Sequence, residues 1–328
     1  MSAIPDDDFA AVLAELREVR ACEPHRIDMS HADRVRRPLL QDDGRLLIVA
    51  ADHPARGALG IGDDPMAMSS RDDLLRRLAA ALENDEVDGV LGTPDVLDDL
   101  ALLGLLDGRV AIASLNRGGL AGASFEMDDR LTAHRLADVL RDRLDMGKAL
   151  VRIDLDDPGT VRTLETIAAE VSAFAQADVP ILLEPFISRR VPQGQRTRVV
   201  NDLSTEAVVR SVAIASGLGG SSRSTWLKVP VVDDMAAVAA ATTLPMLLLG
   251  GDTSADPEGA FRSWADALAL PGVRGLVVGR SLLYPPDGDV EGAVARAVEL
   301  VHGNPVGETP AEAADEAADV AGVRGASA

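Results

Sequence analysis

The stretch Ser224-Thr-Trp-Leu-Lys-Val-Pro230 sets a lysine inside a short apolar run that is typical of a buried strand. A buried strand is an unusual place for a lysine. The chain has 32 basic residues, and lysine occurs only at Lys148 and Lys228, so 30 of them are arginine. Because arginine fills nearly every position that needs only positive charge, Lys228 calls for an explanation specific to lysine.

An amine can do chemistry that a guanidinium cannot. Arginine stays charged at any working pH, whereas an ammonium in an apolar pocket loses its proton and can attack a carbonyl. Lowering the pKa of a lysine from about 10.4 to about 7–8 requires roughly 4 kcal/mol, which burial and a neighbouring cation can supply. Taken alone, Lys228 fits a structural role better, with its amine reaching solvent or pairing with a carboxylate.

Working outward from this stretch, short apolar runs alternate with longer amphipathic segments from Arg45 onward. The predicted strands are Leu46–Ala51, Val87–Leu91, Val110–Leu115, Ala149–Ile153, Pro180–Leu183, Trp226–Val229, Met246–Leu249 and Leu276–Val278. The predicted helices are Asp72–Glu83, Pro94–Leu103, Thr132–Leu144, Thr160–Ala177, Ser204–Ser216, Asp233–Ala241, Pro257–Leu268 and Val290–Val301. Eight β-then-α units predict an α/β fold of the TIM (β/α)8 barrel type. A dinucleotide-binding sheet is less favoured because no glycine-rich fingerprint follows the first strand.

Three regions are predicted along the chain. Residues 1–44 form an N-terminal helical extension, in which apolar residues from Phe9 to Val19 recur at helical spacing. The arginines at 34–37 in this extension are interpreted as a solvated helix end. Residues 45–302 form the barrel, and residues 303–328 form a disordered tail without a repeated apolar pattern.

Composition limits the partners and the setting. A net charge of −21 argues against nucleic acid and anionic membranes as partners. Cys22 is the only cysteine, and the five histidines show no ligand spacing, so neither a disulfide nor a metal site is expected. The acidic run at 6–8 is unlike a secretory signal, which together with the cysteine count favours a cytoplasmic location.

In TIM barrels the chemistry lies at the carboxyl ends of the strands. Asp52, Arg152, Glu184 and Lys228 close or follow the first, fourth, fifth and sixth predicted strands. Strands four to six are neighbours, so Arg152, Glu184 and Lys228 are expected to converge. Each one singly could be an ion pair at a strand end, but convergent charge in a barrel mouth is costly unless it serves a function.

The last two predicted strands end in glycine. Gly250 and Gly251 follow strand seven, and Gly279 with Arg280 follows strand eight. Exposed backbone amides at these two strands are where such barrels bind phosphate, with Arg280 as a counter-charge. Tight turns are the alternative explanation. His53, next to Asp52, is expected to orient the mouth by hydrogen bonding.

Four longer strings carry a family resemblance: Ala51-Asp-His-Pro-Ala-Arg-Gly57, Asn116-Arg-Gly-Gly119, Thr225-Trp-Leu-Lys228 and Val278-Gly-Arg-Ser-Leu-Leu-Tyr284. The chain resembles class I aldolases with the TIM-barrel fold, notably the tagatose-bisphosphate aldolase and the deoxyribose-phosphate or archaeal-type fructose-bisphosphate aldolase group. It is most similar to an actinobacterial aldolase-like family often associated with inositol catabolism.

The resemblance implies roles for the strand-end residues. Lys228 looks like the Schiff-base lysine, Asp52 like the aspartate that assists imine formation, and Glu184 like the proton carrier. Arg152 falls where the tagatose-bisphosphate branch has a lysine, and arginine can orient a substrate but will not relay protons. Arg152 is expected to lower the pKa of the lysine and to bind substrate oxygens.

The predicted function is that of a metal-independent class I aldolase without a cofactor, acting on a phosphorylated sugar or keto-acid derivative in inositol or other carbohydrate catabolism. Two alternatives stay open: a barrel that binds a phosphorylated metabolite without turnover, and a phosphosugar isomerase. The expected partner is a small phosphorylated substrate, and assembly into a homo-oligomer is left open.

Overall fold

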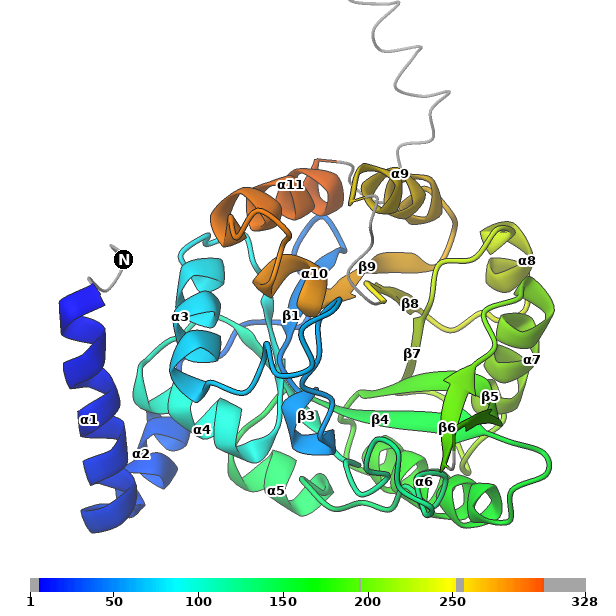
Figure 1. The fold of residues 1–328 in the computed structure, drawn as a ribbon, viewed down its shortest axis with the longest axis horizontal. Coiled ribbons are helices and arrows are strands. Elements are labelled where there is room, and N and C mark those ends of the chain that lie inside the picture. The colour runs from blue at the N-terminus through cyan, green and yellow to red at the C-terminus, as the bar shows by residue number, and fades with distance from the viewer. Residues whose placement is uncertain (1–5, 195, 252–256, 304–328) are drawn as a thin grey trace, which may run out of the picture.

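Eight parallel strands close into a barrel, which confirms the TIM-barrel prediction (Figure 1). The computed structural model describes residues 6–194, 196–251 and 257–303. Around the barrel the order is β1-β2-β3-β4-β5-β7-β8-β9, and β9 pairs with β1 to close it. The strands are β1 Leu46–Ala50, β2 Gly89–Gly92, β3 Val110–Ser114, β4 Met146–Ile153, β5 Ile181–Gln193, β7 Thr225–Val229, β8 Met246–Leu249 and β9 Val273–Val278.

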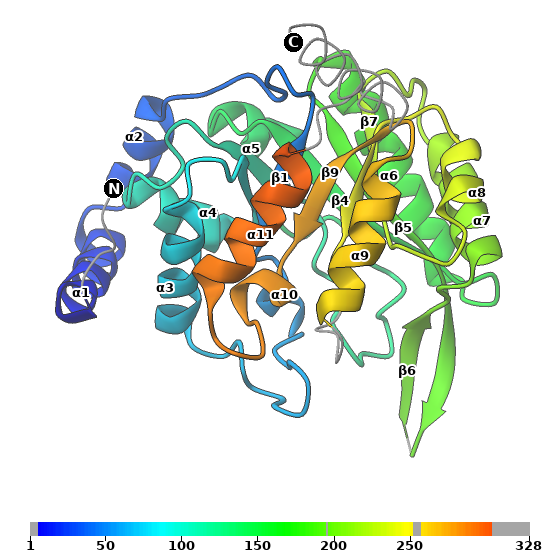
Figure 2. The same ribbon diagram turned by 90° about the horizontal axis from the view of Figure 1, so that it is seen from above.

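Helices cover the outside of the barrel, as Figure 2 shows from a second direction. They are α3 Arg71–Leu82, α4 Pro94–Leu102, α5 Leu136–Arg141, α6 Gly159–Gln176, α7 Thr205–Ser216, α8 Met235–Ala240, α9 Pro257–Leu268, α10 Arg280–Leu283 and α11 Val290–His302. The α5 and α8 helices are shorter than predicted. No described helix has both the length and the apolar character that a membrane span requires. The predicted tail at 303–328 lies outside the described residues apart from Gly303.

The interior of the barrel is built from aliphatic side chains that alternate along each strand. Period two sends every second residue inward, so Leu46, Ile48 and Ala50 of β1 share the inner face. They meet inward residues of the other strands: Leu91, Val110, Ile112, Met146, Leu182, Leu247 and Val277. This dry layer lies below the carboxyl ends of the strands, so polar side chains one step further along each strand rest on an apolar floor.

A hairpin extends from the rim of the barrel. β5 continues past its barrel portion and pairs antiparallel with β6 (Arg196–Asn201), and Figure 2 shows the two strands projecting away from the body. Arg189 and Arg190 lie in the part of β5 that forms this hairpin. Arg190 ties the hairpin to the barrel through Asp157 at 2.8 Å.

The N-terminal extension forms two helices, α1 (Asp6–Cys22) and α2 (His25–Asp33), rather than one. They lie beside α3 and α4 (Figure 1). The interpretation of the arginines at 34–37 as a solvated helix end is wrong. Arg34 is buried and binds Asp145 at 3.0 Å, while Arg37 binds Asp88 at 2.6 Å. These buried acids fix the segment after α2 to the amino-terminal end of the barrel.

Asp88 also links the start of β1 to His302, the last residue of α11. It accepts a hydrogen bond from the Leu47 amide at 2.6 Å and lies 3.2 Å from Nε2 of His302. Nδ1 of His302 lies 2.5 Å from Asp43. Burial lowers the pKa of His302, but Asp88 and Asp43 outweigh it and raise the pKa to about 9.

We expect this histidine to make stability depend on pH. Since its folded pKa lies above the ordinary value of about 6.5, its contribution is complete below pH 6.5 and is lost as the pH rises towards 9. Partial solvent exposure screens the pairs, so the loss should be on the order of 1 kcal/mol. Urea unfolding of the wild type and of His302→Gln from pH 6 to 9 measures it. Parallel curves for the two proteins would contradict the assignment.

Candidate active site

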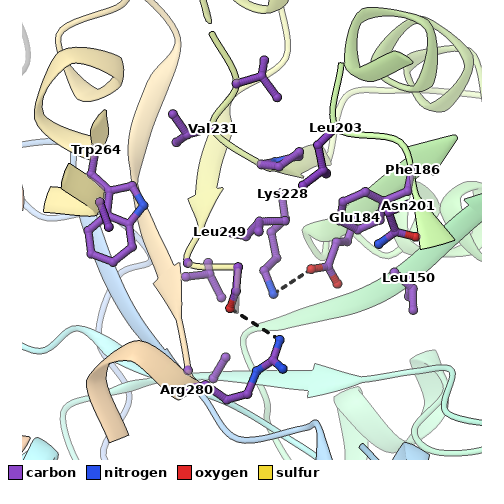
Figure 3. Close-up of a pocket in the computed structure, with 18 of the residues that line it drawn as sticks. Leu150, Glu184, Phe186, Asn201, Leu203, Lys228, Val231, Leu249, Trp264 and Arg280 are labelled. Atoms are coloured by element: carbon purple, nitrogen blue, oxygen red, sulfur yellow. Dashed lines mark hydrogen bonds and ion pairs between the residues drawn. The ribbon is translucent and has the colours of Figure 1, made fainter. Parts of the chain in front are cut away.

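Lys228 lies on β7 at the mouth of the barrel and is 4% exposed. β7 neighbours β5, and the Nζ atom of Lys228 lies 3.0 Å from Oε1 of Glu184 (Figure 3). Both side chains occupy the layer above the apolar floor. The structure thus brings together two of the residues that the sequence singled out, the amine and the carboxylate.

The same carboxylate binds a second amine that sequence reasoning missed. Lys148 on β4 is 1% exposed, and its Nζ atom contacts Oε2 of Glu184. The predicted strand started at Ala149, whereas β4 starts at Met146, so Lys148 had been left outside the strand. Its spacing of four from Arg152 was the available signal, because residues an even number apart in a strand share a face.

Asp52 belongs to the Lys148 side of this cluster rather than to Lys228. It lies 3.4 Å from Nζ of Lys148, forms an ion pair with Arg117, and accepts a hydrogen bond from the Ser114 hydroxyl at 3.2 Å. Arg117 in turn donates from Nε to that hydroxyl at 2.9 Å. A continuous chain of buried contacts therefore runs from Arg117 through Asp52, Lys148 and Glu184 to Lys228.

The line of contacts from Arg117 to Lys228 holds more basic than acidic groups, and this imbalance changes the pKa of both amines. Burial lowers the pKa of Lys228, and Arg117 and Arg280 lower it further while Glu184 opposes them. Burial and Arg117 hold the pKa of Lys148 well below its ordinary value. Burial raises the pKa of Glu184, but Lys148 and Lys228 prevail and hold it well below its ordinary value. Three cations facing two carboxylates favour the loss of a proton from an amine.

Arg152 lines the same pocket but has different partners. Its guanidinium forms an ion pair with Glu126 and lies 3.5 Å from Asp129. The expectation that Arg152 lowers the pKa of Lys228 is therefore corrected, because the cations that do so are Arg117 and Arg280. Arg117 lies in the loop after β3 and is only 6% exposed.

His53 packs beside Asp52 without the expected hydrogen bond. Its buried Nδ1 atom has no hydrogen-bond partner and lies 3.8 Å from the Asp52 carboxylate. Burial, with Arg280 and Lys228, holds the pKa of His53 well below its ordinary value, so the ring is neutral. Within the described residues no three His, Cys, Asp or Glu side chains gather as a metal site would require.

The glycines after β8 and β9 lie beside this cluster. A Cβ on Gly279 would come within 2.4 Å of the Ala50 carbonyl, and one on Gly250 within 2.6 Å of Val278. Gly251 has a φ of +68°, which favours glycine. Nη2 of Arg280 lies 3.4 Å from the Gly251 carbonyl, a contact drawn in Figure 3. Because these positions are glycines, the backbone after β8 and β9 can pack closely at the barrel mouth, and the Arg280 guanidinium lies against it.

A pocket of about 1040 Å³ joins all these groups. Its lining includes seven basic side chains: Arg56, Arg117, Lys148, Arg152, Arg198, Lys228 and Arg280. The lining also holds six acidic side chains: Asp52, Glu126, Glu184, Asp233, Asp234 and Asp266. In a chain with a net charge of −21, a mouth with a slight excess of basic side chains is the more favourable place for an anionic ligand.

Two solved structures share this barrel fold at low sequence identity. A Schiff-base-forming fructose-1,6-bisphosphate aldolase aligns with a TM-score of 0.60 at 19% identity, over 84% of this chain and 99% of that chain. An archaeal fructose-1,6-bisphosphate aldolase aligns with a TM-score of 0.59 at 18% identity, over the same shares.

The chain belongs to the Cgl0159-like family, whose model matches residues 44–298. The crystal structure of Cgl0159 from Corynebacterium glutamicum is 53% identical, with a TM-score of 0.87, over 92% of this chain and 99% of that chain. A comparison with curated protein sequences found no match.

The two lysines allow a direct test of the electrostatics. Lysine labelled with ¹³C at Cε should give two side-chain NMR signals, both titrating below the ordinary value of about 10.4, with Lys148→Arg assigning them. Removing a nearby cation stabilises the protonated amine, so Arg117→Gln should shift the Lys228 titration to higher pH. Arg117→Lys carries a lysine of its own but retains the charge, and should restore the wild-type midpoint. An unchanged midpoint in Arg117→Gln would contradict the charge balance described above.

Proposed function

We propose that this protein is a class I aldolase, in which Lys228 forms a Schiff base with the ketone of a phosphorylated sugar or keto-acid derivative. The observation that carries the proposal is a buried amine 3.0 Å from a buried carboxylate, at the carboxyl ends of barrel strands. A lysine held there with a lowered pKa is a nucleophile matched to carbonyl carbon. The aldolase-like fold supports the same chemistry.

The reaction would begin at the neutral Lys228 amine. Its lone pair attacks the ketone carbon, and the resulting carbinolamine loses its hydroxyl as water to leave an iminium. A base then removes the proton from the hydroxyl group two carbons away from the imine carbon. The C–C bond breaks, its electrons neutralise the iminium as an enamine, and an aldehyde leaves. Protonation of the enamine and hydrolysis release the second product and free the amine.

Glu184 is suited to move the protons in these steps. It lies between two amines, so it can take a proton from the attacking Lys228 and exchange it with Lys148. Asp52 and Arg117 would hold Lys148 in place from the other side. In this scheme Lys148 on β4 takes part in proton transfer, and Arg152 does not.

The phosphate of the substrate would bind at the edge formed by Gly250, Gly251, Gly279 and Arg280. Backbone amides and a guanidinium suit a phosphate, and this edge adjoins Lys228. The substrates to screen first are inositol-derived ketose phosphates, given the resemblance to proteins of inositol catabolism.

Reductive trapping tests the proposal. Borohydride added with a cleavable ketose phosphate should give an adduct that maps to the peptide containing Lys228, and Lys228→Met should abolish both adduct and cleavage. Lys148→Met is the matched control for the site of attachment: it removes the other lysine and leaves the nucleophile, so the adduct at Lys228 should still form even where loss of proton exchange slows cleavage. Cleavage by the wild type without an adduct would overturn the imine route. Proton exchange without fragmentation would indicate an isomerase instead, and binding without any product a non-catalytic barrel.

Replacing the carboxylate separates proton transfer from binding. Glu184→Gln keeps the shape of the side chain but cannot accept a proton, so kcat should fall about 10²- to 10⁴-fold with little change in KM. Steady-state assays of retro-aldol cleavage measure both parameters. A kcat close to wild type would remove Glu184 from the mechanism.

A further inference from the structure

The order of strands sets the angular positions of the charged groups around the mouth. In either direction around the barrel, through β3, β2 and β1 or through β5, β7 and β8, four steps lead from β4 to β9. These two strands are therefore opposite each other. β7, which carries Lys228, lies two steps from each of them. Any group held at the end of β4 is thus across the mouth from Gly279 and Arg280, with the amine midway.

Arg152, near the end of β4, is a fixed cation at that opposite wall. It is 3% exposed, and Nη2 donates to the carbonyls of Gly119 at 3.2 Å and Glu126 at 2.9 Å. Its ion pair with the Glu126 side chain holds the other arm of the guanidinium. The buried Nε–H has no acceptor among the described residues. Its position is therefore set by the loop after β3, while one donor is left without a partner.

Arg56 brings a second guanidinium to the same wall. It ends the one-turn helix η1 (Pro54–Arg56), and its carbonyl accepts a hydrogen bond from Ala121, in the loop that also holds Arg152. Burial lowers the pKa of Arg152, and the charge of Arg56 lowers it further, so the two cations repel. In the described part of the chain no carboxylate lies within ion-pair distance of Arg56, and its buried Nε lacks an acceptor. Arg152 is compensated by Glu126 and Asp129, whereas the partly exposed Arg56 guanidinium lines the pocket without an acid partner among the described residues and can bind an anion that enters it.

We propose that Arg56 and Arg152 bind a second anionic group of the substrate, across the mouth from the Gly279–Arg280 edge. Guanidinium groups bind carboxylates and phosphates through paired hydrogen bonds, so either anion fits. This inference rests on the proposed function and narrows its substrate class. The substrate is an open-chain hydroxyketone with an acidic group at each end and the reacting carbonyl between them.

The test compares substrates that differ only in the far group. Fructose 1-phosphate has an anion beside the ketone alone, fructose 1,6-bisphosphate adds a far phosphate, and a 6-phospho-5-ketohexonate has a far carboxylate. Arg56→Gln should lower kcat/KM about 10- to 100-fold for a doubly anionic substrate and leave the singly anionic one unchanged. Of the two doubly anionic substrates, the one whose kcat/KM falls more shows whether the far group is a phosphate or a carboxylate. Equal losses for all three, or no loss for any, would overturn the proposal.

Two controls keep the result interpretable. Arg130→Gln removes an exposed arginine of the same loop, whose partner is Asp128, and should leave all three substrates unaffected. Arg56→Lys keeps the charge and should recover part of the loss. If the wild type cleaves none of the compounds, the proposed function fails by itself, and calorimetric titration then tests the anion site. Arg56→Gln should weaken binding of the bisphosphate and not of the monophosphate, and equal affinities for the two proteins would overturn the site.

Discussion

The whole site depends on one carboxylate shared between two buried amines. Glu184 faces Lys148 on one side and Lys228 on the other, and all three lie on an apolar layer that excludes water. In such surroundings a charge is tolerated only if it is paired, so removing Glu184 would take the carboxylate away from Lys228 and leave Lys148 with Asp52 alone. The eight-stranded barrel makes the arrangement possible, because it brings β4, β5 and β7 together and aims one side chain from each at the same point.

The distribution of charge over the molecule also concentrates basic groups around the site. The chain as a whole is strongly acidic, yet the mouth of the barrel gathers arginines and lysines around a few carboxylates. Arg117 is buried against Asp52 and adds positive charge that, together with burial, lowers the pKa of Lys228. The remaining cations lie on opposite sides of the mouth, where they suit the acidic groups of a substrate. In the proposed mechanism, pairing within the cluster activates the amine, and the cations at the edges bind the acidic groups of the substrate.

Much of the fold could be predicted from the sequence, because apolar runs and amphipathic helices alternate with a regular period from β1 to α11. Lys228 and Glu184 could be predicted too, since each ends a clear apolar run. Lys148 could not, because Met146-Gly147-Lys148 begins β4 with a glycine and a charge that hide the strand. The role of Arg117 depends on a loop folding back over Asp52, and a contact across 65 positions leaves no local pattern. The hairpin of β5 and β6 was missed for a related reason, since its arginine-rich strands lack an apolar face.

The proposed mechanism requires a covalent bond between Nζ of Lys228 and the substrate. The most direct measurement is a crystal structure of the protein after dihydroxyacetone phosphate has been added and reduced with borohydride. The account predicts continuous density from Nζ of Lys228 to the C2 atom of the ligand, with the phosphate beside Gly279 and Arg280. A ligand bound in the mouth without a bond to Lys228, or bonded to Lys148 instead, would contradict it.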